Sequence, residues 1–443
     1  MKETIVKLIE EKKYNDLKRK LKGITCQDLS LIFNDLSKEQ MILTYRLLSK
    51  DMAVDTFTYM DSDLQEALIS ALTDTELKAI IDDLFMDDTV DLIEEMPSNV
   101  VKRILKNVSK TDRKIINELL KYADDTVGSI MTTEFTDLKS YMTVEEAFTR
   151  IKKIGIDKET IYTCYVLDES RKLIGVVTAK DLLLAERDIK IADIMDTNII
   201  SIHTNDDQEE VGKMFDKYDL LALPVVDLEN RLVGIVTIDD AIDVIQEENT
   251  EDFEKMAAMA PSEDSYLKTP FYIHAKNRII WLLLLMLSSA VTGTIITKYE
   301  VAFASLPVLV SFIPMIMGTG GNCGSQSSTM AIRGLALDEI KFKDIFKVMK
   351  KETLISIMVG IILAIVNGIR IIIFYKDIKL AIVLGLTLIG TVLLAKLLGC
   401  VLPMVAKKLK LDPAIMAAPL ITTIVDTCSI LIYFKIAMLL LNL

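Results

Sequence analysis

The segment LITTIVDTCSILIYFKIAMLLL (Leu420–Leu441) closes an apolar run that starts at Pro413. A helix needs about 20 mainly apolar residues to cross a bilayer core, so this run is long enough. Four earlier runs meet the same requirement, at residues 279–297, 301–332, 353–375 and 380–406. The sequence therefore predicts a five-helix transmembrane domain at residues 276–443.

The composition divides the chain into two unlike halves. Residues 276–443 carry 17 basic and 8 acidic residues, whereas residues 1–275 carry 34 basic and 56 acidic ones. The 443-residue chain is 51% hydrophobic and still 26% charged, which indicates a multidomain membrane protein. This organisation excludes a single soluble enzyme domain, a secreted disulfide scaffold and a disordered chain. The acidic half favours cations over nucleic acid as partners.

Basic loops give the orientation of the membrane half. Six basic residues lie between the second and third spans, and Lys407, Lys408 and Lys410 lie between the fourth and fifth. Such loops stay in the cytosol, so we expect a cytosolic N-terminus and an outside C-terminus in the cell (inner) membrane. The N-terminus has no apolar core for a signal peptide, which agrees with this. Five scattered cysteines and two histidines give no zinc-binding pattern.

Charged residues inside the spans are of two kinds. Arg370 and Lys396 lie near span ends, where a long side chain can reach the membrane interface. Asp426 lies near the middle of the fifth span, roughly 20 Å from either end, where a lone carboxylate is costly. With Thr422 on the same helix face, Asp426 predicts a cation site in a pore. The alternative is a neutral, hydrogen-bonded aspartic acid at a helix contact.

The second span contains the Gly-rich sequence GTGGNCGSQSS (Gly318–Ser328). Glycines let backbones approach closely or leave helical geometry, and irregular backbone in a membrane is tolerated only around a cavity. We expect Gly320, Gly321 and Asn322 to line the pore. A close-packed helix contact is the alternative.

Residues 128–245 contain an internal repeat with an offset of 59 residues. YVLDESRKLIGVVTAKD (Tyr165–Asp181) matches PVVDLENRLVGIVTIDD (Pro224–Asp240). Each unit predicts an α/β arrangement of strand, turn, strand and helix, and the doubled Gly-x-x-Thr-x-x-Asp pattern resembles a tandem CBS (Bateman) pair. Such pairs commonly bind adenine nucleotides, so the resemblance implies ATP or a related nucleotide. The residues in question are Thr178, Asp181, Thr237 and Asp240. The alternative is that Asp181 and Asp240 cap the helices that follow.

Residues 1–127 predict a helical domain. An apolar residue followed by Ser, Asp or Thr recurs every 12 residues, and each step indicates a short helix with its N-cap. Pairs of such helices form an α-solenoid. The steps lie at Leu36-Ser37, Leu48-Ser49, Met60-Asp61 and Leu72-Thr73, then less regularly at Met86-Asp87, Met96-Pro97 and Val108-Ser109.

Acidic residues cluster at three places in the cytosolic half. They lie at Asp87–Asp91, at Asp206–Glu209 with Asp219, and along Asp239–Glu254. The last group leads into a connecting helix predicted at residues 246–275. A solvated acidic face is the simplest interpretation. However, packing such domains together requires neutralisation, which hard divalent cations provide through oxygen ligands.

Together these features resemble the MgtE family of magnesium transporters, in domain order and over nearly the whole chain. The motifs that carry the resemblance are Pro314 with Gly318–Ser328, and Asp412-Pro-Ala with Pro419–Asp426. The resemblance implies a homodimer with a pore between the subunits, a pore carboxylate at Asp426 and a site at Asp412 that faces a connecting plug helix. It also implies regulatory metal ligands at Asp87, Asp91, Asp207, Glu209, Asp219, Asp240, Asp243, Glu248, Glu251 and Asp252.

The expected function is a Mg²⁺-selective channel or transporter that imports magnesium down its electrochemical gradient. Cytosolic Mg²⁺, bound by the acidic domains, is expected to close it. No Walker A sequence or other hydrolytic motif occurs, so we do not expect an enzyme. The alternatives are a CBS-gated carrier for another divalent cation, a proton- or sodium-coupled cation carrier that uses Asp426, and a membrane-tethered nucleotide sensor without transport.

Overall fold

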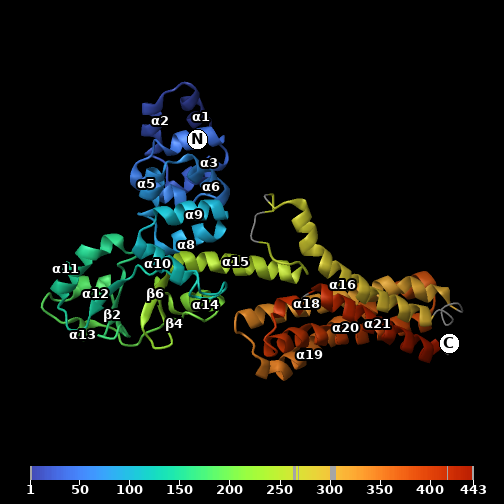
Figure 1. Cartoon of the computed structure of the whole chain (residues 1–443). Helices are drawn as coiled ribbons and strands as arrows, with labels where there is room; N and C mark the ends of the chain where they lie inside the picture. The colour runs from blue at the N-terminus through green and yellow to red at the C-terminus, as the bar shows by residue number, and fades with distance from the viewer. Residues whose placement is uncertain (1, 263–265, 268, 300–305, 417, 442–443) are drawn as a thin grey trace. The chain divides into compact units, whose positions relative to one another are not determined.

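The computed structural model describes residues 2–262, 266–267, 269–299, 306–416 and 418–441. The chain forms two compact bodies, residues 1–245 and residues 246–443. The first contains a helical region followed by two small β-sheets, and the second contains long apolar helices (Figure 1). The boundary between the bodies falls within helix α15 (Ile238–Met256).

Short helices stack one upon another in the first part of the first body (Figure 1). Four predicted steps begin where the sequence places them, because Ser37, Ser49, Asp61 and Thr73 are the N-caps of consecutive helices. Ser37 and Thr73 also form capping boxes, which pair two backbone N–H groups at each helix start. The α-solenoid is thereby confirmed. Its helices are α1 (Lys2–Glu10), α2 (Tyr14–Leu21), α3 (Cys26–Asn34), α4 (Lys38–Tyr45), α5 (Lys50–Thr58), α6 (Ser62–Ala71), α7 (Asp74–Ile81), α8 (Met86–Glu95), α9 (Ser98–Asn107) and α10 (Lys110–Leu119).

The step predicted at Met86-Asp87 is wrong in its position. Phe85 is the N-cap of α8, and Asp87 lies inside the helix. Phe85 offers no side-chain acceptor, so the carboxylate of Glu134 accepts the Met86 N–H instead, at 2.9 Å. The cap comes from a distant part of the chain, which a local sequence pattern does not reveal.

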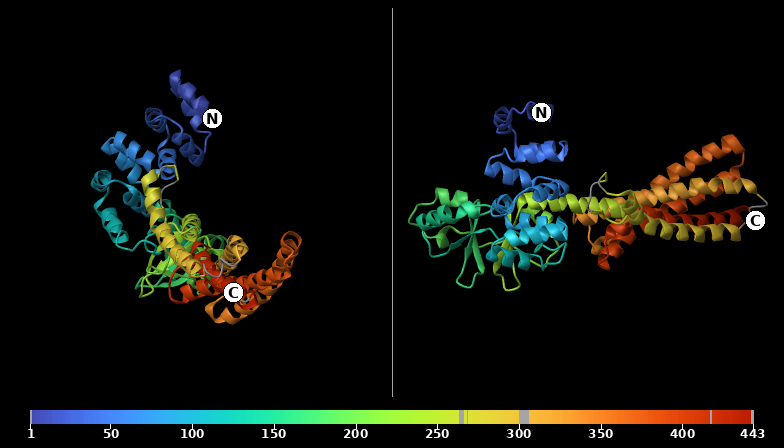
Figure 2. Two further views of the ribbon diagram at one scale, coloured as in Figure 1. Left: turned by 90° about the vertical axis from the view of Figure 1, so that its right-hand side faces the viewer. Right: turned by 45° about the horizontal axis from the view of Figure 1, so that its top comes forward.

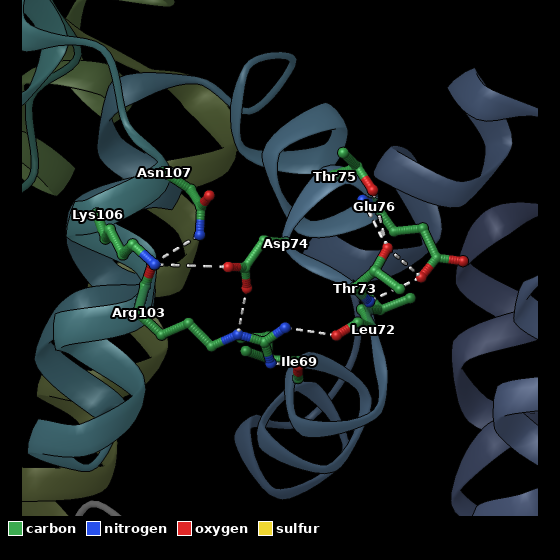
Figure 3. Close-up of polar contacts among 9 residues, drawn as sticks. All are labelled: Ile69, Leu72, Thr73, Asp74, Thr75, Glu76, Arg103, Lys106 and Asn107. Carbon is green, nitrogen blue, oxygen red and sulfur yellow. Dashed lines mark hydrogen bonds and ion pairs between the residues drawn. The ribbon is translucent and has the colours of Figure 1, made fainter.

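A network around Arg103 joins helices that are distant in sequence (Figure 3). Arg103 of α9 donates hydrogen bonds to the carbonyl oxygens of Ile69 and Leu72, and its Nε donates to Asp74 at 3.0 Å. The two carbonyls lie at the end of α6, where the helix supplies no further donors. Arg103 therefore caps α6 from α9 with charge-assisted hydrogen bonds.

We expect Arg103→Met to lower the free energy of unfolding of the helical region by about 2 kcal/mol, because carbonyl oxygens of α6 lose their donors. Lys106→Met is the matched control, since Lys106 reaches the same Asp74 only at 3.8 Å from an exposed position. Exposed pairs contribute about 0–1 kcal/mol. Proteolysis of the full chain in increasing urea measures both variants, and an equal loss in the two would contradict the capping role.

Two three-stranded sheets follow and reproduce the repeat. Their strand orders are β1–β2–β3 and β4–β5–β6, each with one parallel and one antiparallel pairing. Val166 pairs with Gly175 and Val225 pairs with Gly234, and a register shift follows each pair. The elements are β1 (Thr136–Lys139), α11 (Val144–Ile154), η1 (Gly155–Asp157), β2 (Thr163–Leu167), β3 (Leu173–Thr178), α12 (Ala179–Leu184), α13 (Ile191–Ile194), β4 (Ile202–His203), α14 (Glu209–Tyr218), β5 (Ala222–Val226) and β6 (Leu232–Thr237).

The first residues of each CBS unit pack against a strand of the other unit, at the glycine of the repeat. A Cβ at Gly175 would lie 2.7 Å from Sδ of Met195, which lies at the start of the second unit. A Cβ at Gly234 would lie 2.7 Å from Sδ of Met131, which lies at the start of the first unit. Isolated backbone bridges join the same segments. Each unit therefore needs a residue without a side chain at this point, because the other unit packs directly on its backbone.

Long helices lie side by side in the second body (Figure 2). Of the described residues, four helical segments are long and apolar enough to cross a membrane: Phe271–Lys298, Phe342–Tyr375, Ile378–Lys408 and Pro413–Leu441. The Gly-rich helix α18 contacts both α20 and α21. Five spans thus stay a prediction, and residues 301–305 of the second lie outside the described residues. The elements are α16 (Phe271–Lys298), η2 (Pro307–Phe312), α18 (Ile313–Ala336), η3 (Phe342–Asp344), α19 (Ile345–Tyr375), α20 (Ile378–Lys408), η4 (Pro413–Met416) and α21 (Ala418–Leu441).

The connecting helix differs from its predicted bounds of 246–275. Helix α15 begins at Ile238, directly after β6, and ends at Met256, and the next helix begins at Phe271. The acidic sequence is helical from the second CBS unit onward because no Gly or Pro interrupts it.

Lys396 is buried between helices, and its predicted position at the membrane interface stays a prediction. Its side chain is only 7% exposed, and its Nζ lies 3.8 Å from Glu352 of α19. Arg370, by contrast, is exposed and lies 5.8 Å from the ring centre of Phe312. Lys435 is a further charge within α21, and its side chain is exposed.

Candidate functional site

Asp426 lies on α21, which begins at Ala418. The carboxylate-bearing residue is therefore about 12 Å from the N-terminal end of this helix and about 22 Å from its C-terminal end, nearer to one end than predicted. Its side chain is half-buried, and within the described parts of the chain it has no hydrogen bond or ion pair. A carboxylate among apolar helices needs a cation beside it to remain charged at low cost.

The Gly-rich part of α18 passes close to this carboxylate. A Cβ at Gly321 would lie 3.0 Å from Thr422 and 3.9 Å from Oδ1 of Asp426. Gly320 is buried against α20 and α21, whereas Asn322 is exposed. The glycines are helical throughout, so of the two alternatives, close approach and departure from helical geometry, the structure has the first. They allow the helices to approach closely. Four of the five predicted pore residues therefore lie together, namely Gly320, Gly321, Thr422 and Asp426.

Asp412 lies just before η4 and binds Lys255 of α15. The Nζ of Lys255 is 2.8 Å from Oδ2 of Asp412 and 2.7 Å from Oε1 of Glu251. Partial burial works against the ammonium ion, but hydrogen bonds to the two carboxylates hold the pKa of Lys255 above its ordinary value. Two predicted metal ligands, Glu251 and Asp412, are thus brought together with a lysine between them.

The first body contains an acidic cluster formed by α8, the loop before β2 and the start of α15. Asp87 is only 8% exposed. Glu159 has a buried Oε2 without a hydrogen-bond partner in the described structure. Carboxylate oxygens are the ligands that hard divalent cations take, although no three described carboxyl groups of the single chain are arranged to hold one. The members of the acidic cluster are Asp87, Asp88, Asp91, Glu159, Asp239 and Asp240.

Members of the acidic cluster raise one another's pKa. Desolvation and the charges of Asp240 and Asp239 raise the pKa of Asp88 to about 6. Desolvation and the charges of Asp240 and Asp88 raise the pKa of Glu159 to about 8. Asp91 lies at the exposed rim, where desolvation and the same neighbours also raise its pKa and solvent screening limits the effect. The raised pKa values mean that the acidic cluster holds protons more readily than isolated carboxyl groups do.

Several other predicted metal ligands make local contacts. Asp207 accepts the Glu209 N–H at 2.9 Å, and Glu209 pairs with a lysine on its own helix. Asp219 ends α14 in the left-handed conformation, with φ of 51°. Asp243 lies one turn beyond Asp240 on α15, where desolvation and the charge of Asp239 raise its pKa.

The predicted regulatory acids do not form one site. Glu248, Glu251 and Asp252 lie on the part of α15 that belongs to the second body. Within the described ranges, no three His, Cys, Asp or Glu side chains of this single chain are arranged to hold a metal ion.

The two predicted nucleotide-binding pairs are built alike. In each, the Asp carboxylate accepts hydrogen bonds from the hydroxyl and the N–H of the Thr three residues earlier. Thr178 is thus the cap of α12, and Asp181 completes a capping box. Both residues are exposed, whereas Thr237 is buried and Asp240 belongs to the acidic cluster. Like charges disfavour a phosphate at the second pair.

Known families match successive parts of the chain. Residues 24–125 match the MgtE intracellular N domain, residues 127–188 and 191–247 match the CBS domain, and residues 313–436 match a family described as a divalent cation transporter. The magnesium transporter MgtE of Bacillus subtilis is 33% identical over 433 residues, which are 98% of this chain and 96% of the relative. The chain belongs to the MgtE family of magnesium transporters.

Further MgtE relatives agree with this. The magnesium transporter MgtE of Thermus thermophilus is 32% identical over 430 residues, covering 96% of this chain and 95% of the relative. A crystal structure of the soluble part of a magnesium transporter has a TM-score of 0.52 and 30% identity over 56% of this chain and 97% of that chain. The cytosolic domain of the Mg²⁺ channel MgtE in complex with ATP has a TM-score of 0.53 and 32% identity over 55% of this chain and 100% of that chain. The sequence-based family and multidomain membrane fold are thereby confirmed.

Sequence reasoning did not predict a role for three of the residues described above. Glu134 and Glu159 come from loops of the first CBS unit, and no periodic pattern marks them. Lys255, by contrast, follows Glu251 by four residues, a spacing at which helical side chains meet. That spacing was a usable signal for the pair in this MgtE chain.

Proposed function

We propose that the chain is a Mg²⁺-selective channel or transporter whose ion path runs along α18 and α21. The half-buried Asp426 carboxylate carries this proposal, because it lies beside Gly321 and Thr422 without a described partner of opposite charge. An ionisable residue in a membrane helix marks an ion path by default. Transport of an ion requires no bond-breaking chemistry, and we assign no enzymatic reaction.

A homodimer completes the ion site in this proposal. Mg²⁺ gives up its water reluctantly and prefers few carboxylates with retained waters. Two Asp426 carboxylates, one from each subunit, hold a hydrated ion without trapping it. The exposed side of α18, which carries Asn322, is available to the second subunit. With a cytosolic N-terminus in the cell membrane, the membrane potential drives import by about 4.6 kcal/mol per 100 mV for a divalent ion.

Mg²⁺ is also the regulatory ion in this proposal. The acidic cluster holds negative charges close together, and a divalent ion among them removes their repulsion. Binding there stabilises the packing of α8 against the start of α15. Because α15 continues into the second body, this ordering acts on the pore and closes it when magnesium is plentiful. An ion that favours the closed form is bound more tightly by that form.

An adenine nucleotide is the second ligand that we propose, held at Thr178 and Asp181. A solved MgtE cytosolic domain contains ATP. The exposed position of Thr178 and Asp181 leaves this pair accessible, whereas the acidic cluster surrounds Asp240. The repeat is therefore asymmetric in ligand binding.

Uptake of Mg²⁺ by liposomes reconstituted with the full chain tests the proposed function. We expect uptake that grows with an inside-negative potential and does not depend on a pH or sodium gradient. Dependence on either gradient would identify a coupled carrier. Absence of any flux would leave a nucleotide sensor without transport.

We expect Gly320→Val to reduce Mg²⁺ flux at least about tenfold, because overpacking at a helix contact costs 1–3 kcal/mol. A Cβ at Gly320 would lie 2.8 Å from Thr391 and 2.9 Å from both Ser429 and Val425. Gly318→Val is the matched control, since nothing lies within 4 Å of its Cβ position. Equal flux in the two variants would remove the close approach of α18 from the mechanism.

A further inference from the structure

A buried polar group joins three helices of the second body. Oγ of Ser327 on α18 donates a hydrogen bond of 2.8 Å to Oε2 of Glu352 on α19. The same oxygen lies 3.8 Å from Nζ of Lys396 on α20. Ser327 is 2% exposed, and the side chains of Lys396 and Glu352 are 7% and 15% exposed. This triad is the set Ser327, Glu352 and Lys396.

The Gly-rich part of α18, Gly318–Ser328, has no large apolar side chain to hold its position. Its crossing with α20 is a backbone contact, because a Cβ at Gly399 would lie 2.4 Å from the carbonyl oxygen of Gly324 and 2.9 Å from Cβ of Ser327. Crossings of small residues allow close approach. However, they lack the ridges and grooves that fix rotation and depth in ordinary helix packing.

The triad supplies the missing constraint. Burying an ion pair costs about as much desolvation free energy as the charges recover, so net stabilisation does not explain it. A buried pair does specify one register, because any shift that separates the charges leaves each of them unpaired. Ser327 couples α18 to that pair through a directional hydrogen bond.

We propose that the triad fixes the position of α18 and thereby the width of the ion path beside Asp426. Ser327 follows Gly321 by six residues, about 9 Å along the helix axis, a span over which a helix moves as one piece. Gly321 contacts Thr422 and faces Asp426, so rotation of α18 changes the distance across the ion path. The triad residues are positioning residues, and they determine which ions pass. The proposal rests on the proposed transport function and adds a determinant of its selectivity.

The ratio of Mg²⁺ to Mn²⁺ flux in liposomes tests the proposal, because a mere loss of folded protein scales both fluxes alike. We expect Ser327→Ala to change this ratio about fivefold, the equivalent of one hydrogen bond. Ser325→Ala is the matched control, since in the described part of the chain Oγ of Ser325 donates only to the Gly321 carbonyl of its own helix. An unchanged ratio in Ser327→Ala, or an equal change in Ser325→Ala, would overturn the proposal.

Two double variants separate the hydrogen bond from the charges. Glu352→Gln with Lys396→Met removes both charges but keeps an acceptor for Ser327, and we expect a ratio near that of the wild type. Glu352→Met with Lys396→Met removes the acceptor as well, and we expect the same change as in Ser327→Ala. The same ratio in both double variants would contradict positioning through the hydrogen bond.

Amide hydrogen exchange of the purified full chain gives a readout that is independent of transport. We expect faster exchange over residues 313–336 in Ser327→Ala and in the double methionine variant, and unchanged exchange in Ser325→Ala. Absence of Mg²⁺ flux in the wild-type chain would contradict the proposed function but not the positioning role. Equal amide exchange in all variants would contradict the positioning role.

Discussion

Asp426→Asn is expected to reduce Mg²⁺ uptake by a factor of about 100 or more. The amide keeps the shape of the side chain and removes its charge. At a separation of about 5 Å and an effective dielectric constant of 20, a carboxylate attracts each unit of cation charge by about 3 kcal/mol. Loss of that attraction removes the ion from the path. Initial uptake rates in liposomes, measured with a Mg²⁺-sensitive dye, give the factor directly.

Asp377→Asn provides a matched control for the same chemical change. Oδ1 of Asp377 accepts the N–H groups of Lys379 and Leu380 and thereby caps α20. Asn caps helices as well as Asp does, so uptake is expected to stay near the wild-type rate. Chromatography establishes that both variants retain the oligomeric state of the wild type. Rapid uptake by Asp426→Asn would place the ion site elsewhere.

The metal-free first body is expected to lose protease resistance as the pH rises from about 5 to about 8. When α8 packs against the start of α15, the pKa values of Asp88 and Glu159 lie at about 6 and about 8, above their ordinary values of 3.8 and 4.5. In this pH range the packed acidic cluster therefore binds more protons than the same residues do in solvent. The stability of the packed state is thus present at low pH and falls as the pH rises. Adding Mg²⁺ at pH 8 should restore protection by replacing those protons.

The triple variant Asp88→Asn, Asp91→Asn and Glu159→Gln should remove both responses. Each pair of carboxylates about 5 Å apart repels by about 3 kcal/mol, so neutralisation keeps the first body protected without Mg²⁺. Removal of three exposed or half-buried charges from α5 and α6 serves as the control, with the substitutions Asp51→Asn, Asp55→Asn and Glu66→Gln. A control that behaves like the triple variant would show that net charge alone matters, and a wild type insensitive to Mg²⁺ would end the sensor proposal.

Features set by neighbouring residues could be predicted from the sequence. Ser37 and Thr73 cap helices because their acceptors lie within three residues of the donors. The CBS units follow from a repeat that the strand registers preserve. The long apolar segments follow from composition alone, since crossing a bilayer requires length and hydropathy.

Features set by contacts between distant segments could not be predicted in this way. The sequence around Lys396 does not reveal its buried contact with Glu352, because Glu352 approaches from another helix. Glu134 caps α8 from a loop of the CBS pair, and Glu159 joins the acidic cluster in the same manner. The Gly-rich sequence fits either irregular backbone or close helix contact, and only the packing around Gly320 decides between them.

Lys255 places a permanent competitor at a predicted metal position. Its ammonium group is tethered to α15, so it faces Glu251 and Asp412 at an effective concentration on the order of millimolar or above. A divalent ion can enter between these carboxylates only by displacing a cation that never diffuses away. The ion concentration at which this junction responds is therefore expected to be set by the displacement equilibrium rather than by the affinity of bare carboxylates.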